Sequence, residues 1–260
     1  MRPAAARAPS YAVPALEKGL DLLEALADGP GDRSQAELAR ALGRSASEIF
    51  RMLACLERRG YIVKDAASGR YRLTLRLYEL AHTHTPVDQL LHAADGPMRD
   101  LARRARESVH LSVLSAGKLL VLAQIESRNR TRVSVEIGGR FPAVLTASGR
   151  ILLAHLPQEE LRGFLARDED WGRLSAPARE RFLADLLRIR RDAIYQGKSN
   201  LTHGIRDVAA FIGNPRIGIA AAVCVPSLTV IGRPKKPAEL RSAVKECAAT
   251  ITRQLGLRVT

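Results

Sequence analysis

Hydroxyl, amide and charged side chains gather between residues 34 and 51 and again near residue 70, at spacings suited to a nucleic-acid surface. Serine and arginine can donate hydrogen bonds to phosphate oxygens and base edges, and a glutamate can accept one from the amino group of cytosine. The candidate DNA contacts are Ser34, Gln35, Arg44, Ser45, Ala46, Ser47, Glu48, Arg51, Arg70 and Arg72. For Glu48 a second interpretation is open, as the capping partner of Ser45. Arg51 could instead pair within the protein.

Two short amphipathic helices are predicted to hold most of these side chains. Gly43 lies between them and can adopt the positive φ that ends a helix within two residues. Apolar residues recur at helical spacing on both sides of it, as Leu38, Ala39 and Leu42 before the turn and Ile49, Met52, Leu53 and Leu56 after it. This arrangement is typical of a helix-turn-helix, whose second helix lies in the DNA major groove.

The segments around this motif complete a winged helix-turn-helix over residues 13–75. A first helix is predicted over residues 14–27, with Leu16, Leu20, Leu23 and Leu26 on one face. Strand-like runs at 61–64 and 70–75 flank a polar turn and predict a β-hairpin, the wing. Residues 1–12 are rich in Ala and Pro and are predicted to be a disordered lead-in, and residues 76–90 a linker helix.

The remainder of the chain, residues 91–260, mixes predicted strands and helices. Strands are expected at 109–114, 119–123, 131–137 and 217–225, and helices at 90–106, 148–156, 158–166, 177–195 and 237–255. The fold class is therefore a two-domain α+β or α/β protein.

Composition limits the function less sharply than the motifs do. The net charge is +14, but most of the excess lies after residue 85, outside the helix-turn-helix. The three cysteines, Cys55, Cys224 and Cys247, are too far apart for a zinc or disulfide pattern. No apolar run is long enough to span a membrane and no signal peptide is recognised. We expect a cytoplasmic protein without metal, cofactor or membrane partner.

Segments in both halves resemble the IclR family of bacterial transcription regulators in their order and spacing. The matching segments are residues 15–24, 37–43, 51–53, 60–62 and 70–73 in the first half and 108–114, 138–142, 146–154, 191–197 and 204–210 in the second. The resemblance implies a C-terminal GAF-like effector-binding domain. It also implies a DNA-binding repressor or activator that acts as a homodimer or homotetramer on a partly palindromic operator. A small metabolite, often an organic acid, would modulate its DNA binding.

The resemblance also places the effector site, at Phe141, Ala147, Ser148, Ile205, Asp207, Cys224 and Pro226. Backbone N–H groups of Ala147 and Ser148 at a helix N-terminus could bind a carboxylate, or this could be an ordinary helix cap. Asp207 stands where some members have cysteine, and Cys224 and Pro226 where some have serine, which argues against glyoxylate or pyruvate. An anionic effector is still expected, with Arg128, Arg130, Arg132, Arg140 and Arg206 as candidate clamps.

Two other function classes are open. The protein could be an architectural DNA-binding oligomer whose second domain only assembles it. It could, more remotely, be an enzyme that uses Ser112, Ser148, His110 and Asp207, but no Gly-x-Ser-x-Gly elbow or phosphate loop supports this. We expect no enzyme activity, and we expect His110 to be a packed core residue.

Overall fold

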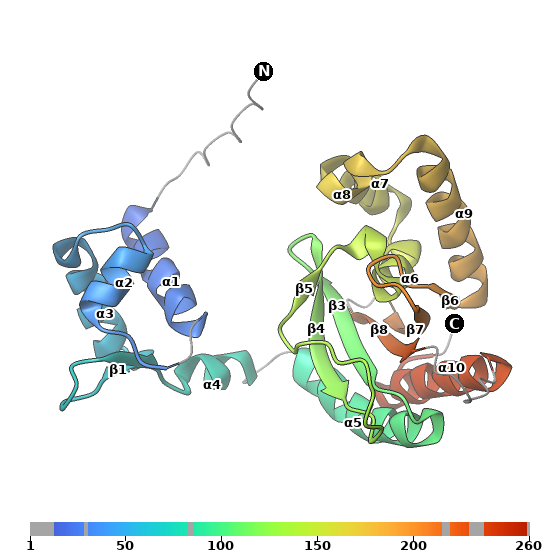
Figure 1. Ribbon diagram of the computed structural model, residues 1–260, viewed down its shortest axis with the longest axis horizontal. Helices are drawn as coiled ribbons and strands as arrows, with labels where there is room; N and C mark the ends of the chain where they lie inside the picture. Colours follow the sequence, from blue (N-terminus) through green and yellow to red (C-terminus); the bar gives the residue numbers. More distant parts are fainter. Residues whose placement is uncertain (1–12, 29–30, 83–85, 215–218, 229–236, 259–260) are drawn as a thin grey trace. The chain divides into compact units, whose positions relative to one another are not determined.

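The computed structural model describes residues 13–28, 31–82, 86–214, 219–228 and 237–258. The predicted lead-in, residues 1–12, lies outside the described residues. The chain divides into two compact units, Met1–Thr85 and Pro86–Thr260 (Figure 1).

The first unit is a winged helix-turn-helix, as predicted. Its elements are α1 (Pro14–Ala27), α2 (Gln35–Ala41), α3 (Ala46–Arg58), β1 (Ile62–Lys64), β2 (Tyr71–Leu73) and α4 (Arg76–His82). The strands β1 and β2 pair antiparallel as the wing, and Arg33 forms an isolated bridge to Tyr71 beside it. The fully buried aliphatic side chains at the centre are Leu22, Leu38, Ile49, Leu53 and Ile62. They join the three helices and the wing in one core, which holds α3 in place.

Helix α1 buries only the C-terminal half of the predicted face, Leu23 and Leu26, together with Leu22. Leu22 and Leu26 are buried, and Leu23 packs partly against the same core. Leu16 and Leu20 are instead 60% and 49% exposed. Both sets follow helical spacing, so periodicity alone could not choose between them.

The second unit is built on one antiparallel sheet of six strands, in the order β5-β4-β3-β8-β7-β6. The strands are β3 (Val109–Ser115), β4 (Lys118–Ile125), β5 (Arg140–Phe141), β6 (Ile194–Lys198), β7 (Ile205–Asn214) and β8 (Ile219–Leu228). Because β3 and β8 are central and far apart in sequence, the sheet joins the two ends of this unit.

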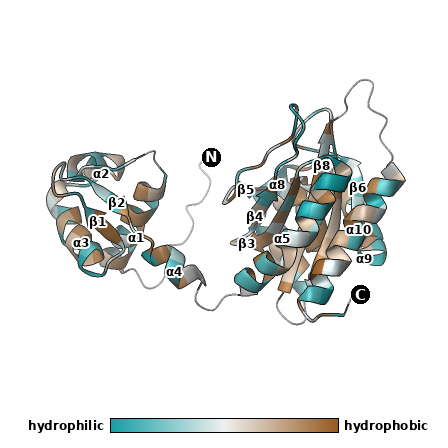
Figure 2. Ribbon diagram, turned by 90° about the horizontal axis from the view of Figure 1, so that it is seen from below, coloured by the Kyte–Doolittle hydropathy of each residue, from teal (hydrophilic) through white to brown (hydrophobic). Residues whose placement is uncertain are grey.

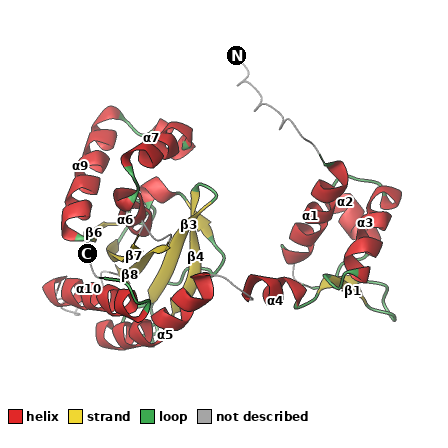
Figure 3. Ribbon diagram, turned by 180° about the vertical axis from the view of Figure 1, so that it is seen from behind, coloured by secondary structure: helices red, strands yellow, loops and turns green. Residues whose placement is uncertain are grey.

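Helices cover both faces of the sheet (Figure 3). Helices α5 (Pro86–Ala105) and α10 (Pro237–Gln254) pack on one face, and α6 (Ala147–His155) with α9 (Ala176–Asp192) on the other. The short helices η1 (Ala143–Leu145), α7 (Gln158–Arg167) and α8 (Glu169–Arg173) accompany α6 and α9. Burial on both faces explains why β7 and β8 read as almost continuous apolar runs, and Figure 2 shows these hydrophobic strands behind α5 and α10.

Several predicted boundaries differ from the structure. Residues 131–137 form no strand, and the N–H of Val135 bonds instead to the side chain of Gln124 at 2.6 Å. Helix α9 ends at Asp192 rather than Tyr195, because Ala193 takes a left-handed conformation (φ 54°) and starts the turn into β6. Strands β6 and β7 were not predicted. The predicted linker, residues 76–90, covers parts of two helices, α4 and α5, which belong to different units.

No helix among the described residues has both the length and the apolar character that crossing a bilayer requires.

Candidate DNA-binding surface and effector site

Both helices of the helix-turn-helix begin with a capping box. In α3 the N–H of Ser45 donates to Glu48 Oε2 at 2.9 Å, and the N–H of Glu48 donates to Ser45 Oγ at 3.3 Å. In α2 the N–H of Ser34 donates to Glu37 Oε2 at 2.7 Å, and the N–H of Glu37 returns to Ser34 Oγ at 3.3 Å. Only the α3 box is predicted from the sequence, although Ser34 and Glu37 have the same spacing.

A basic side chain from another element completes each box. Arg70 of the wing lies 2.6 Å from Glu37 Oε2, and Lys18 of α1 lies 3.3 Å from Glu48 Oε1. The pKa of Glu37 falls to about 2 because it accepts the N–H of Ser34 and then a bond from Arg70. The pKa of Glu48 also falls to about 2, through the bonds from Ser45 and then from Lys18. Both carboxylates are therefore ionised and engaged at neutral pH.

Other predicted DNA contacts also have partners within the unit. Arg44 pairs with Asp21 at 3.0 Å and Arg72 with Asp32 at 3.7 Å. The side chain of Gln35 donates to the carbonyl oxygen of Ala46 at 2.9 Å. These bonds orient α2, α3 and the wing, and contact of the same residues with DNA stays a prediction.

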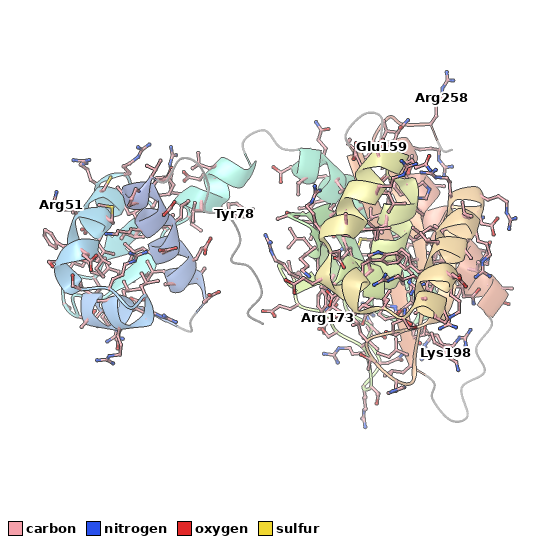
Figure 4. The ribbon with its side chains drawn as sticks, turned by 90° about the horizontal axis from the view of Figure 1, so that it is seen from above. Arg51, Tyr78, Glu159, Arg173, Lys198 and Arg258 are labelled. Carbon is pink, nitrogen blue, oxygen red and sulfur yellow. The ribbon has the colours of Figure 1, made fainter. Side chains whose placement is uncertain are left out.

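Arg51 lies on the outer surface of α3. It is exposed, and Figure 4 shows it at the outer edge of the first unit. Within the part of the chain that the structure describes, it forms no hydrogen bond or ion pair. Ala46 and Ser47 are exposed near the start of the same helix, where the Ser47 and Ser45 hydroxyls lie 3.1 Å apart. The alternative of an intramolecular pair for Arg51 therefore has no support in this structure.

Strand register brings the predicted effector residues together on one face of the sheet. Asp207 of β7 lies opposite Pro226 of β8, and Cys224 lies opposite His110 of β3. Directly paired residues project to the same face. Ile205 lies two residues before Asp207 and shares that face. This is the face that α6 and α9 cover.

The start of α6 closes over these strands. Thr146 caps the helix by accepting the N–H of Gly149 at 3.2 Å. Ala147 and Ser148 follow and are buried, and Ser148 Oγ lies 3.4 Å from Nε2 of His110. Phe141 packs against the same core as Ala147. Phe141, Ala147 and Cys224 thus belong to the core between the sheet and α6. Asp207, Pro226 and Ile205 lie on the sheet face that this core covers.

The cluster is polar, buried and short of partners. Asp207 is 9% exposed, and burial raises its pKa to about 6. Burial lowers the pKa of His110 to about 4 and raises that of the Cys224 thiol, which the Asp207 charge raises further. No described side chain pairs with Asp207, and His110 Nδ1 and Ser112 Oγ are buried without a partner among the described residues.

Sequence reasoning missed Arg150 and Tyr195 beside this cluster. The Arg150 guanidinium lies 2.7 Å from Asp185 of α9, and its centre lies 5.7 Å from the ring of Tyr195. Tyr195 was assigned to a helix, and Arg150 was not among the candidate clamps. Arg128, Arg130, Arg132, Arg140 and Arg206 are exposed, and Arg132 pairs with Glu126 at 2.8 Å.

Both units match the sequence models of one class of helix-turn-helix transcriptional regulators. Residues 82–253 match the family model described as bacterial transcriptional regulator IclR C-terminal. Residues 15–66 match the family model of the IclR helix-turn-helix domain. The chain belongs to the IclR family and is a DNA-binding transcriptional regulator.

Its similarity extends over whole proteins. The glycerol operon regulatory protein of Streptomyces coelicolor is 30% identical over 94% of this chain and 97% of its own. The regulator XynR of Escherichia coli is 24% identical over 94% and 98%. An IclR homolog from Microbacterium hydrocarbonoxydans, solved with 4-hydroxybenzoate, has a TM-score of 0.77 at 20% identity, covering 93% of this chain and 99% of that one. Thermotoga maritima IclR has a TM-score of 0.69 at 22% identity, covering 93% and 98%.

Proposed function

We propose that this regulator is a homo-oligomer that binds a partly palindromic operator through α3 and changes its DNA affinity when an organic acid occupies the effector domain. The proposal of an effector site rests on the cluster of Asp207, His110, Ser148 and Cys224 under α6. A protein core rarely leaves buried polar atoms without partners, and two such atoms, His110 Nδ1 and Ser112 Oγ, lie on the same face of the sheet as Asp207 and Cys224.

An anionic effector must reach a site that already contains a carboxyl group. The N–H groups at the start of α6 favour a carboxylate, and the 4-hydroxybenzoate-bound homolog shares the fold. Two carboxylates close together cannot both remain ionised without cost, so one of them takes up a proton. With its pKa already raised to about 6, Asp207 is the group that does so. Effector binding should therefore be coupled to protonation of Asp207.

Calorimetric titration tests this proposal directly. Benzoate, 4-hydroxybenzoate and a set of aliphatic carboxylates are titrated into the full chain between pH 5.5 and 8. We expect at least one to bind, to bind more tightly as pH falls from 8 towards 6, and to take up protons above pH 6, as measured in buffers of different ionisation enthalpy. In Asp207→Asn this pH dependence should disappear, whereas it should persist in the control Asp95→Asn, whose carboxylate pairs with Arg99 on the exposed side of α5. If none of these carboxylates bound, the result would favour the alternative of an architectural DNA-binding oligomer whose second domain only assembles it.

Two exposed apolar stripes support the homo-oligomer. At α1, the N-cap residue Val13 and the helical residues Leu16 and Leu20 follow each other at three- and four-residue spacing and are 49–60% exposed. On α4, Leu77 and Leu80 are 38% and 46% exposed. Figures 1 and 3 show α4 on the α1 side of the unit, away from α3. A second copy that covered these stripes would leave α3 free for DNA.

Sedimentation velocity tests the assembly. Leu16→Glu with Leu20→Glu should shift the protein towards monomer and weaken operator binding. The double variant Leu183→Glu and Leu187→Glu, on exposed positions of α9, serves as the matched control. An unchanged sedimentation coefficient in the α1 variant would contradict the proposal.

We also propose that the protein acts in the cytoplasm, where its DNA partner is found, and that it is not an enzyme. The relatives are named as regulators. The contact between Ser148 and His110 does not resemble an activated nucleophile, because a histidine of pKa about 4 is a weak base at neutral pH. Esterase activity that fell in Ser148→Ala would contradict this.

A further inference from the structure

Phe50 is an aromatic side chain on the outer face of α3. Helix α3 buries Ile49 and Leu53 in the core of the first unit. Its opposite face carries exposed side chains at positions 47, 50, 51 and 54, which share one stripe at helical spacing. Phe50 is 56% exposed in the middle of this stripe. Phe50 therefore stands on the face of α3 that the core of the first unit leaves uncovered.

Several polar side chains near the start of α3 are already bonded within the protein. Glu48 accepts bonds from Ser45 and Lys18, and Arg44 pairs with Asp21. The side chain of Gln35 is bonded to the backbone of α3. Of the α3 side chains that could enter the groove, Phe50 and Arg51 are the large ones that no described residue engages. The surface offered to DNA is therefore one apolar ring beside one cation.

The apolar group that base edges display in the major groove is the 5-methyl group of thymine. We propose that Phe50 packs on thymine methyl groups in the operator and is a specificity-determining residue, while Arg51 beside it binds a guanine edge or a phosphate. This rests on α3 being the helix that enters the groove. The partner that we propose for Phe50 is duplex DNA. If Phe50 instead packed against a second copy of the chain, its replacement would alter the oligomeric state.

Replacing thymine by deoxyuridine tests the proposal, because it removes the methyl group and leaves the base pair intact. The full chain first selects its preferred duplexes from a random library. The selected duplex is then synthesised with each thymine in turn replaced by deoxyuridine, and affinities are measured by fluorescence anisotropy at fixed salt. At one or two positions in each half-site, we expect about fourfold weaker binding, equivalent to about 0.8 kcal/mol for one buried methyl group.

Phe50→Ala should bind the thymine and deoxyuridine duplexes equally, whereas Phe50→Leu should retain part of the difference. The matched control is Arg51→Ala, which should bind every duplex more weakly but keep the full ratio. Since Phe50 is exposed, Phe50→Ala and Phe50→Leu should both unfold at the wild-type temperature.

Enrichment of a duplex by the wild-type protein tests DNA binding itself. The ratio of the affinities for the thymine and deoxyuridine duplexes tests the role of Phe50. Selected sites without thymine, a wild-type ratio of one at every position, or a ratio that survives Phe50→Ala would each overturn the proposal. So would a change of oligomeric state in Phe50→Ala.

Discussion

Gly149 lies where α6 passes closest to η1, and replacing it by alanine should destabilise the second unit strongly. A Cβ at this position would lie 2.6 Å from both the Cα and the carbonyl carbon of Ala143, and closer still to the carbonyl oxygen. All three are backbone atoms, so no side-chain rotation relieves the overlap. Gly149 also donates its N–H to the capping side chain of Thr146, so a displacement of α6 would break that bond.

The expected loss follows from the depth of this overlap. Overpacking a core typically costs about 1–3 kcal/mol, and a clash with fixed backbone should lie at or above the upper end. About 3 kcal/mol corresponds to a fall in melting temperature of roughly 6–12 °C for a unit of this size. Gly96 provides the control, because it lies in the 20-residue helix α5 and an added Cβ would meet nothing within 4 Å. Gly96→Ala should raise stability by about 0.5–1 kcal/mol.

Differential scanning calorimetry of both variants checks the sign of each change, and hydrogen–deuterium exchange of α6 peptides locates it. Gly149→Ala should exchange faster in α6 and bind an effector less tightly, since Ala147 and Ser148 would move with the helix. A Gly149→Ala protein that melted within about 1 °C of wild type, with unchanged exchange in α6, would refute the close approach on which this reasoning depends.

Three further predictions concern the caps and the buried cluster. Ser45→Ala should lower the stability of the first unit by about 1 kcal/mol in urea unfolding, whereas Ser47→Ala should change it by less than half as much. Glu48→Gln, which can still accept the N–H of Ser45, should bind the selected operator within twofold of wild type, and a larger change tied to one cytosine would show a base contact instead. Because the folded pKa of Asp207 is about 6 against an ordinary 3.8, its ionisation opposes folding increasingly as pH rises from about 4 to 6. Asp207→Asn should therefore stabilise the protein at pH 7 but not at pH 4, and equal melting shifts at both pH values would exclude this coupling.

The first unit could be predicted almost completely because its signals are local. Apolar spacing, Gly43 and the Ser45 capping box lie within a few residues of the bonds they form, so the sequence contains both partners. The face of α1 was predicted only in part, for the opposite reason: Leu16 and Leu22 both fit helical spacing, and only contact with α2 and α3 decides which is buried. Likewise, the Arg70 and Glu37 partnership spans 33 positions, and no periodicity indicates it.

The sheet of the second unit shows the same limit. Residues 131–137 alternate as a strand does, but a ladder needs a neighbouring backbone, and the side chain of Gln124 takes the N–H of Val135 instead. Strand β7 was missed because Arg206 and Asp207 interrupt the start of its apolar run. The effector residues were placed by resemblance, while their convergence depends on register between β3, β7 and β8, which pair residues about 20 to 110 positions apart.

We expect the apolar Phe50 to contribute more to DNA sequence specificity than the charged residues near α3, which is the reverse of what residue types alone suggest. Arginine and glutamate at contact positions are the obvious DNA readers, yet here the protein satisfies Arg44, Arg70 and Glu48 itself. A side chain that already has a good partner must break that bond to reach DNA, so its net gain from a base contact is small. Phe50 has no such competing bond and gains the full benefit of burial against a methyl group. Specificity should therefore depend most on the side chains that the folded protein leaves unsatisfied.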